Sequence, residues 1–237
     1  MNIADPYQEF SKIFDRVASA QKYVKWQQWI NDVWTKHGLS PKSLLDLACG
    51  TGNNAIRFSH QGLKVFGVDS SQGMLNEARA KKSNVQFSYG NFLNFLLPQT
   101  VDAVICLDFS TNYILRFDEF AEFINRVYAS LNSGGIFIFD FKPVNSFVKK
   151  EKHLKENDFI FDWVCNTHFT PFVVIDMNIA LANGRTFQER HIERGYNVQE
   201  IKQVVSATKF SLLEVYDDCI LKTPNDNSEL IQLVLKK

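Results

Sequence analysis

Apolar segments of strand length alternate with amphipathic segments of helix length between residues 44 and 141, and this alternation limits the choice of fold more than any other feature. The apolar runs predict strands at 44–48, 63–68, 85–89, 101–107 and 136–141, and the spacing of apolar residues predicts helices at 53–60, 71–82 and 117–131. Strands that are joined by helices pair in parallel, and the helices then cover both faces of the sheet. The pattern therefore predicts a doubly wound α/β fold around a mostly parallel sheet.

The pattern changes after Pro143. Partial alternation of apolar and polar residues predicts strands at 159–165, 172–178 and 185–191, and Asn183-Gly184 before the last of them is a strong hairpin signal. We expect these strands to form an antiparallel sheet that is inserted into the α/β domain. The charged run at 149–155 is expected to be a solvated connector.

The end of the chain returns to the main domain. A helix is expected at 198–208, and Asn197 and Glu200 stand in capping-box positions before it. Strands expected at 212–216 and 230–235 form an antiparallel pair that rejoins the main sheet and completes seven strands.

The start of the chain has a helical pattern. Aromatic and aliphatic residues recur at three- or four-residue steps over 5–37, and Gly38 and Pro41 close this region. We therefore expect three parts. They are an N-terminal helical cap at 1–40, the α/β domain at 41–145 and 196–237, and the inserted sheet at 146–195.

Composition excludes several classes of function. The 237 residues include 45% hydrophobic and 22% charged residues, and the formal net charge is zero, which argues against a nucleic-acid partner. The chain shows no signal-type start and no run of membrane-spanning length, so we expect a cytoplasmic protein with no membrane partner. The four cysteines and five histidines show no metal-ligand spacing, so we expect buried thiols and no metal.

The loop after the first predicted α/β strand carries the main functional signal. GTGNNA fits the G-x-G-x-x-G/A pattern of a dinucleotide-binding loop, and Asp69 stands where a ribose-binding carboxylate is expected. Asp46, however, enters the loop with a charge that repels a pyrophosphate and attracts a cation. The residues together describe a nucleoside with a positively charged tail and no phosphate, and S-adenosylmethionine is such a molecule.

At this point the sequence resembles the class I S-adenosylmethionine-dependent methyltransferases. LLDLACGTG resembles their first motif, GVDSSQGMLNEAR the second, NVQFSYGNFLNF the third, VDAVICLDFSTNYI the fourth and LNSGGIFIFDF the fifth. The segments FSKIFDR…YVKW and QERHIERGY…VYDD resemble the small-molecule branch of that family, so the similarity covers nearly the whole chain. The resemblance implies a Rossmann-like methyltransferase fold, with S-adenosyl-L-methionine as cofactor and S-adenosyl-L-homocysteine as product.

The resemblance also implies a set of cofactor contacts. Asp46 is expected at the methionine end, Asp69 at the ribose hydroxyls, and Asn91 near the adenine amino group, where the family often has Asp. The full set is Tyr23, Trp26, Asp46, Ala48, Gly50, Gly52, Asp69, Ser70, Met74, Asn91, Phe92 and Leu107.

Candidate residues for the acceptor come from three places. Phe14 belongs to the N-terminal cap, and Asn112 and Tyr113 follow the fourth strand of the main domain. Glu189 and His191 are two residues apart on a predicted strand of the insert, so both face the same side of it. If that side covers the cofactor, His191 is a candidate general base oriented by Glu189, with Tyr113 as a third catalytic candidate. The alternative is that both lie on the solvent face of an edge strand.

These features predict an enzyme that transfers a methyl group to a nitrogen or oxygen atom of a small-molecule acceptor. RNA or protein methylation is the alternative enzyme function, and it needs a basic strip that the sequence does not show. A catalytically silent S-adenosylmethionine-binding domain and an NAD(P)-dependent oxidoreductase are further alternatives. The sequence leaves the monomer and the homodimer open as assembly states.

Overall fold

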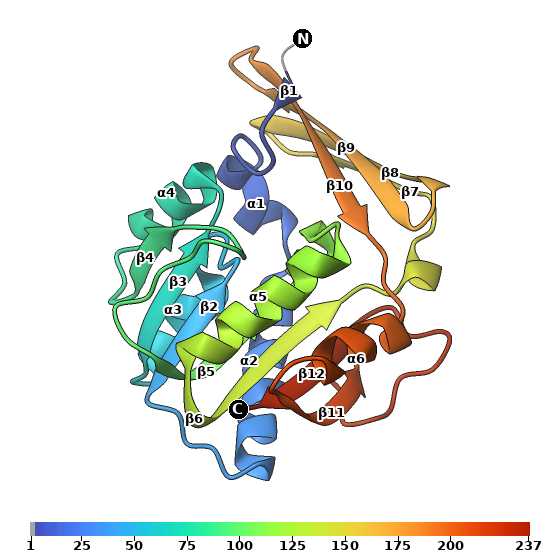
Figure 1. The fold of residues 1–237 in the computed structure, drawn as a ribbon. Helices are drawn as coiled ribbons and strands as arrows, with labels where there is room; N and C mark the ends of the chain where they lie inside the picture. The colour runs from blue at the N-terminus through green and yellow to red at the C-terminus, as the bar shows by residue number, and fades with distance from the viewer. Residues whose placement is uncertain (1–2) are drawn as a thin grey trace.

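Seven strands form the central sheet of the protein, whose computed structural model describes residues 3–237 (Figure 1). Their order is β11-β12-β6-β5-β2-β3-β4, and β12 pairs antiparallel with both of its neighbours while the other pairs are parallel. The strands are β2 (Ser43–Leu47), β3 (Lys64–Asp69), β4 (Gln86–Tyr89), β5 (Val101–Cys106), β6 (Leu131–Phe141), β11 (Ser211–Asp217) and β12 (Ile231–Lys236). The predicted mostly parallel, seven-stranded fold is confirmed.

Helices cover both faces of this sheet. α5 (Phe117–Ser130) and α6 (Val198–Ser206) pack on one face, and α2 (Ala20–Lys36) and α3 (Asn53–His60) pack on the other (Figure 1). The side chains of β2 alternate between these two cores, since Leu45 and Leu47 belong to the first and Leu44 to the second. A strand that is buried on both faces needs a mainly apolar sequence, and β2 has one that only Ser43 and Asp46 interrupt.

The centre of the sheet determines where a ligand can bind. β2 pairs in parallel with β3 on one side and with β5 on the other, so the strand order reverses beside β2. Ligands of open α/β sheets bind beyond the carboxyl ends of the strands at such a reversal. The glycine loop follows β2 directly, and α4 (Gln72–Ala80) begins just after β3.

The protein has a second sheet that is separate from the central one. Its order is β1-β10-β9-β8-β7, and its neighbours pair antiparallel except for β1 with β10. The strands are β1 (Ile3–Ala4), β7 (Lys150–Lys155), β8 (Phe159–Phe169), β9 (Phe172–Leu181) and β10 (Thr186–Arg194). α1 (Ser11–Val17) packs on this sheet, with Phe10 stacked on Phe161 at 4.9 Å between ring centroids.

Local signals identified in the sequence are present. Asn197 and Glu200 form a capping box at the start of α6, and the Asn183-Gly184 turn joins β9 to β10 with φ of 82° at Gly184. All four cysteines are free and buried. Within residues 3–237, no helix is long and apolar enough to cross a membrane.

The helical pattern at 5–37 corresponds to two helices, α1 and α2, which Ala18 separates with an extended backbone of φ −81° and ψ 138°. Two local predictions were wrong. Residues 149–155 are not only a connector, because β7 adds an edge strand to β8 and exposes charged side chains that protect the edge from further pairing. Residues 3–4 form a short strand rather than part of the cap helices.

Two short 3-10 helices, η1 (Ser110–Tyr113) and η2 (Val144–Ser146), follow β5 and β6.

Candidate active site

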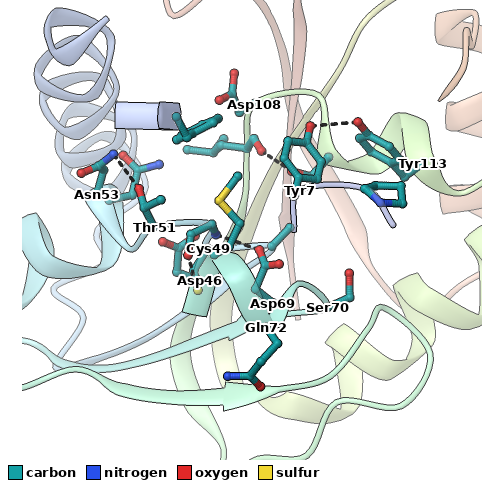
Figure 2. Close-up of a pocket in the computed structure, with 18 of the residues that line it drawn as sticks. Tyr7, Asp46, Cys49, Thr51, Asn53, Asp69, Ser70, Gln72, Asp108 and Tyr113 are labelled. Carbon is teal, nitrogen blue, oxygen red and sulfur yellow. Dashed lines mark hydrogen bonds between the residues drawn. The ribbon is translucent and has the colours of Figure 1, made fainter. Parts of the chain in front are cut away.

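A cavity of about 660 Å³ opens at the carboxyl ends of β2, β3 and β5. Its wall is completed by residues 5–8, by Phe14, by α2 and by η1, so the predicted N-terminal cap contributes to it, whereas no residue of the predicted insert at 146–195 lines it. Figure 2 shows Asp46, Cys49 and Asp69 at the strand ends and Tyr7 and Tyr113 beyond them. Cavities of roughly 300–1,000 Å³ are typical of small-molecule sites.

The glycine loop owes its shape to three residues with positive φ. Ala48, Gly50 and Gly52 have φ of 56°, 54° and 78°. Ala48 and Gly50 line the cavity, but Gly52 does not. A Cβ atom at residue 52 would lie 2.7 Å from the ring of Phe87, so this glycine is required by its conformation and by packing rather than by direct ligand contact.

Asp46 is the most unusual group at the strand ends. Its side chain is 2% exposed, lines the cavity, and has an Oδ2 atom without a hydrogen-bond partner. Burial raises the pKa of this carboxyl to about 8. A buried, unpartnered carboxylate is costly unless a cation pairs with it. The cavity therefore offers a site for a positively charged group beside the glycine loop.

Asp69 ends β3 and faces the same cavity. Its Oδ2 accepts the Gly50 N–H at 2.8 Å and its Oδ1 accepts the Ser71 N–H at 2.8 Å, which fixes the carboxylate. Each oxygen keeps capacity for one more donor, as a ribose diol requires. Burial raises the pKa of Asp69 above its ordinary value, although these backbone donors oppose the shift.

The predicted purine contacts divide into two groups. Ser70, Met74 and Phe92 line the cavity. Asn91 does not, because its Oδ1 accepts the Leu93 N–H at 2.9 Å in a local turn and its side chain is exposed. The structure therefore does not place Asn91 at the expected position.

A polar cluster that the sequence did not reveal holds the glycine loop against α1. Asp15 accepts from the Thr51 hydroxyl at 2.6 Å and the Asn53 amide at 2.8 Å, and it pairs with Lys81 at 2.6 Å. Lys81 also donates to the Thr51 carbonyl at 2.8 Å. These contacts hold the pKa of Asp15 below its ordinary value, although the partial desolvation of this 40% exposed side chain opposes the shift.

The turn after β5 places the carboxylate of Asp108 at the cavity, which the sequence did not reveal. Asp108 and Phe109 have φ of 66° and 60°, and both of their N–H groups donate to Asp140 at 3.0 and 2.8 Å. Asp140 is fully buried, and burial raises its pKa to about 8. Asp108 lines the cavity beside Leu107 and pairs with Lys22 at 2.5 Å.

Aromatic rings of α2 lie below this ion pair. The Lys22 ammonium lies 5.0 Å from the ring centroid of Tyr23 and 5.2 Å from that of Trp26. Both rings line the cavity, as does Phe14. The structure thus brings the predicted cap residues to the cavity. Lys22 lies beside them but does not line the cavity.

Glu189 and His191 lie on the inner face of β10 and not on its solvent face. They are 1% and 0% exposed. His191 Nδ1 lies 2.7 Å from the Tyr113 hydroxyl, and Nε2 lies 3.3 Å from Glu189 Oε2. His191 does not line the cavity, whereas Tyr113 does, so any contact of His191 with an acceptor runs through Tyr113.

Asn112 is not placed as the sequence suggested. It is fully buried and away from the cavity wall. Its amide donates to the carbonyls of Lys142 and Arg194 at 3.0 and 2.7 Å, and its Oδ1 accepts the Lys142 N–H at 2.9 Å. Its hydrogen-bonding groups tie η1 to β6 and β10, which is a structural role rather than an acceptor contact.

Tyr7 is the main functional candidate that the sequence did not reveal. It lines the cavity, and its hydroxyl lies 2.8 Å from that of Tyr113. Tyr7 lies within the helical pattern of apolar residues at 5–37, and that pattern gives it no functional role. Among residues 3–237, no group of three or more His, Cys, Asp or Glu side chains is arranged to hold a metal ion.

Comparisons with known proteins agree with this geometry. Residues 44–135 match a family model described as a methyltransferase domain. The chain is 30% identical over 236 residues to "Putative methyltransferase YqeM" of Bacillus subtilis (strain 168), and the match covers 94% of each.

Two solved structures share the whole fold. An S-adenosylmethionine-dependent methyltransferase from Clostridium acetobutylicum ATCC 824 has a TM-score of 0.85 at 24% identity, covering 97% of this chain and 98% of that one. CalS10, described as an amino pentose methyltransferase from Micromonospora echinaspora with S-adenosylmethionine bound, has a TM-score of 0.76 at 19% identity, covering 100% and 98%. With the seven-stranded sheet, the glycine loop and the near full-length relative, the chain belongs to the class I S-adenosylmethionine-dependent methyltransferases.

Proposed function

We propose that this methyltransferase transfers the methyl group to a nitrogen or oxygen atom of a small-molecule acceptor. The supporting observation is the cavity of about 660 Å³ between the strand ends and the N-terminal segment. Its two halves differ in chemistry, with Asp46 and Asp69 at the strand ends and the Tyr7 and Tyr113 hydroxyls opposite.

The residues at the strand ends fit the cofactor. The free Oδ2 of Asp46 suits a cationic amino-acid end, and Asp69 suits a ribose diol. We assign Tyr23, Trp26, Ala48 and Gly50 to the surroundings of the methionine end. The remaining cofactor assignments are Ser70, Met74, Phe92 and Leu107, all of which line the cavity.

The chemistry required of the protein is limited. S-adenosylmethionine supplies a methyl group that its sulfonium already activates. The chain's own residues then hold the acceptor in line, exclude water and receive the acceptor's proton. We assign the first two tasks to Phe14, Tyr113 and the aromatic rings of α2, and the third to His191 with Glu189. In this assignment residues 1–40 and 146–195 form the acceptor side.

A small acceptor is favoured over RNA or protein. The chain carries no net charge, and the cavity wall contains no lysine or arginine among the described residues. The fold relative CalS10 is described as acting on an amino pentose, which supports an acceptor of that size.

Two measurements test this function. Calorimetry is expected to show binding of S-adenosylmethionine and S-adenosylhomocysteine and none of NAD. Asp69→Ala is expected to weaken both by about tenfold or more, because the ribose loses its acceptor, while Asp226→Ala on the surface leaves them unchanged. Equal affinity in Asp69→Ala would show that the site is misplaced.

The acceptor requires a direct assay. Purified protein with S-adenosylmethionine is screened against amines, alcohols, amino sugars, RNA and protein, and S-adenosylhomocysteine is quantified. Turnover only with RNA or protein would contradict the small-molecule proposal. Cofactor binding without turnover on any of them would favour a silent binding domain.

A further inference from the structure

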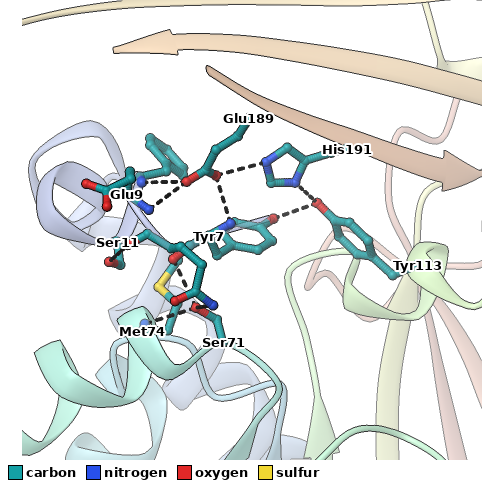
Figure 3. A network of polar contacts seen from close by, with 10 residues as sticks. Tyr7, Glu9, Ser11, Ser71, Met74, Tyr113, Glu189 and His191 are labelled. Atoms are coloured by element: carbon teal, nitrogen blue, oxygen red, sulfur yellow. Dashed lines mark hydrogen bonds and ion pairs between the residues drawn. The ribbon is translucent and has the colours of Figure 1, made fainter. Parts of the chain in front are cut away.

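A continuous row of polar groups leads from the cavity into the second sheet. The Tyr7 hydroxyl contacts the Tyr113 hydroxyl at 2.8 Å, which contacts His191 Nδ1 at 2.7 Å (Figure 3). His191 Nε2 contacts Glu189 Oε2 at 3.3 Å. Only the two tyrosines in this row line the cavity, so the histidine and the carboxylate lie behind them.

The contacts of Glu189 determine which group donates and which accepts each hydrogen bond in this row. Its Oε2 accepts the Tyr7 N–H at 2.7 Å, and its Oε1 accepts the N–H groups of Glu9 and Phe10 at 2.7 and 2.9 Å. Burial opposes ionisation, but the hydrogen bonds from His191 and these backbone groups hold the pKa of Glu189 below its ordinary value. A carboxylate can only accept hydrogen bonds.

The donor or acceptor role of every other group in the row follows from Glu189 being an acceptor. His191 Nε2 faces the Glu189 carboxylate and therefore donates a hydrogen bond to it, so Nδ1 is the acceptor when the ring carries a single proton. The Tyr113 hydroxyl then donates to Nδ1, and its oxygen accepts from the Tyr7 hydroxyl. The Tyr7 oxygen is left with lone pairs at the cavity. Burial raises the pKa of both hydroxyls well above their ordinary values, which keeps them protonated in this arrangement.

The backbone of Tyr7 indicates that this side chain is specifically required. Its φ is 63°, which is unfavourable for a bulky residue and costs about 1–3 kcal/mol. Two contacts hold it there. Its N–H donates to Glu189 and its carbonyl accepts from the Ser71 hydroxyl at 2.9 Å (Figure 3). Strain that persists under such restraint is common at functional sites.

We propose that Tyr7, Tyr113 and His191 form a proton path whose entry is the Tyr7 oxygen, and that the acceptor is a neutral or cationic molecule whose reacting N–H or O–H group is itself uncharged. This proposal rests on the proposed function. As the acceptor's lone pair forms the bond to the methyl carbon, its proton passes to the Tyr7 oxygen. The Tyr7 proton passes to Tyr113, and the Tyr113 proton passes to His191 Nδ1. The resulting imidazolium is stabilised by the Glu189 carboxylate.

The cavity wall narrows the acceptor class further. Four aspartates line the cavity, and no lysine, arginine or histidine does among the described residues. Lys22 lies nearby, but its ammonium is paired with Asp108. A carboxylate or phosphate acceptor would therefore find no lysine, arginine or histidine of the cavity wall to pair with. Primary amines, secondary amines and alcohols fit both the wall and the Tyr7 lone pair.

One further carboxyl faces the path. Glu193 continues the inner face of β10, is 8% exposed and interacts with Tyr113. Burial raises its pKa to about 7, with Lys142 opposing the shift and Asp108 adding to it. Glu193 is the competing destination for the Tyr113 proton, and a variant at this position separates the two routes.

The first test determines which His191 nitrogen carries the proton, and it needs no methyl acceptor. Protein labelled with ¹⁵N-histidine is studied by NMR at pH 8 with saturating S-adenosylhomocysteine, and His191→Gln assigns the ring among the five histidines. We expect the neutral Nε2–H form, with an Nδ1 resonance that shifts in Tyr113→Phe and stays unchanged in Glu193→Gln and in Tyr128→Phe. An Nδ1–H form, a doubly protonated ring, or no shift in Tyr113→Phe would overturn the proposal.

The entry point is tested by turnover with the most active amine or alcohol of the acceptor panel. Tyr7→Phe is expected to lower kcat by about a hundredfold, to leave S-adenosylhomocysteine affinity within about twofold, and to remove any solvent isotope effect. Tyr128→Phe, a tyrosine outside the cavity, is expected to match the wild type. Wild-type kcat in Tyr7→Phe would refute the path. Exclusive turnover of carboxylates or macromolecules would instead refute the acceptor class, while the NMR result still tests the path.

Discussion

At the scale of single residues, we propose that Asp46 determines which cofactor the loop accepts. A pyrophosphate would add negative charge to a carboxylate that already lacks a partner, whereas an ammonium or sulfonium supplies the missing one. The same glycine-loop geometry can therefore hold ligands of opposite charge, and one buried side chain distinguishes between them.

The raised pKa of Asp46 predicts proton release on binding. With a pKa of about 8 the free protein holds a neutral carboxyl at pH 7, and a cationic ligand favours the ionised form. Binding of S-adenosylmethionine at pH 7 is expected to release close to one proton, and affinity is expected to rise by up to about tenfold per pH unit between pH 6 and 8. Calorimetry in buffers of different ionisation enthalpy measures this. Asp46→Asn is expected to abolish the proton release, and release that persists would assign it to another group.

Gly52 allows a second prediction at this scale. Alanine at this position must adopt φ of 78° and overlap the Phe87 ring, whereas alanine at Gly62 must adopt φ of 89° in open space. We expect Gly52→Ala to lower the free energy of unfolding by about 1–3 kcal/mol more than Gly62→Ala. Urea denaturation compares the two, and adding Phe87→Leu should recover part of the difference. Equal losses would mean that only the backbone conformation matters.

At the scale of elements, one carboxylate joins the N-terminal segment to the second sheet. Glu189 on β10 accepts three backbone N–H groups just before and at the start of α1, groups that a short helix cannot satisfy internally. The sequence placed Glu189 beside a base. Its contacts show that it also fixes the segment that covers the cavity.

We therefore expect Glu189→Gln to loosen this segment selectively. The neutral amide presents donors to donors and leaves backbone N–H groups unpaired, at a cost of about 1–3 kcal/mol. Hydrogen exchange should become faster over residues 7–17 and remain unchanged in β2 and β5. Glu151→Gln on the exposed edge strand serves as the control. Uniformly faster exchange throughout the chain would indicate global destabilisation instead.

At the scale of the whole molecule, the cofactor should act as a structural component. In the proposed assignment it lies between the strand ends and the N-terminal segment and pairs the buried Asp46. At a concentration of S-adenosylhomocysteine 100 times its Kd, stability should rise by about 2.7 kcal/mol and Tm by about 5–10 °C. Calorimetric melting at several ligand concentrations measures the shift, and a Tm independent of concentration would contradict it.

Much of this architecture could be predicted because its signals are local. The buried strands are mainly apolar runs, interrupted in β2 by Asp46, and the glycine loop, the capping box and the Asn183-Gly184 turn each depend on neighbouring residues. The groups that were missed act over long separations. Tyr7 reaches Tyr113 across 106 positions and Asp15 reaches Thr51 across 36. Asn112 shows the reverse, since a polar residue after a strand satisfied distant backbone groups rather than a ligand.

Hydrogen bonds hold the segment that carries Tyr7 at three separate places. They join it to Glu189 on β10, to Ser71 before α4 and, through Asp15, to the glycine loop. Because Tyr7 and Gln8 line the cavity, we expect the exchange of spent cofactor for fresh cofactor to require some of these hydrogen bonds to break. Breaking them would also release Tyr7 from Tyr113. On the proposed path, the group that accepts the proton would then be in place only while the reactants are enclosed, and the rate of opening would set an upper limit on turnover.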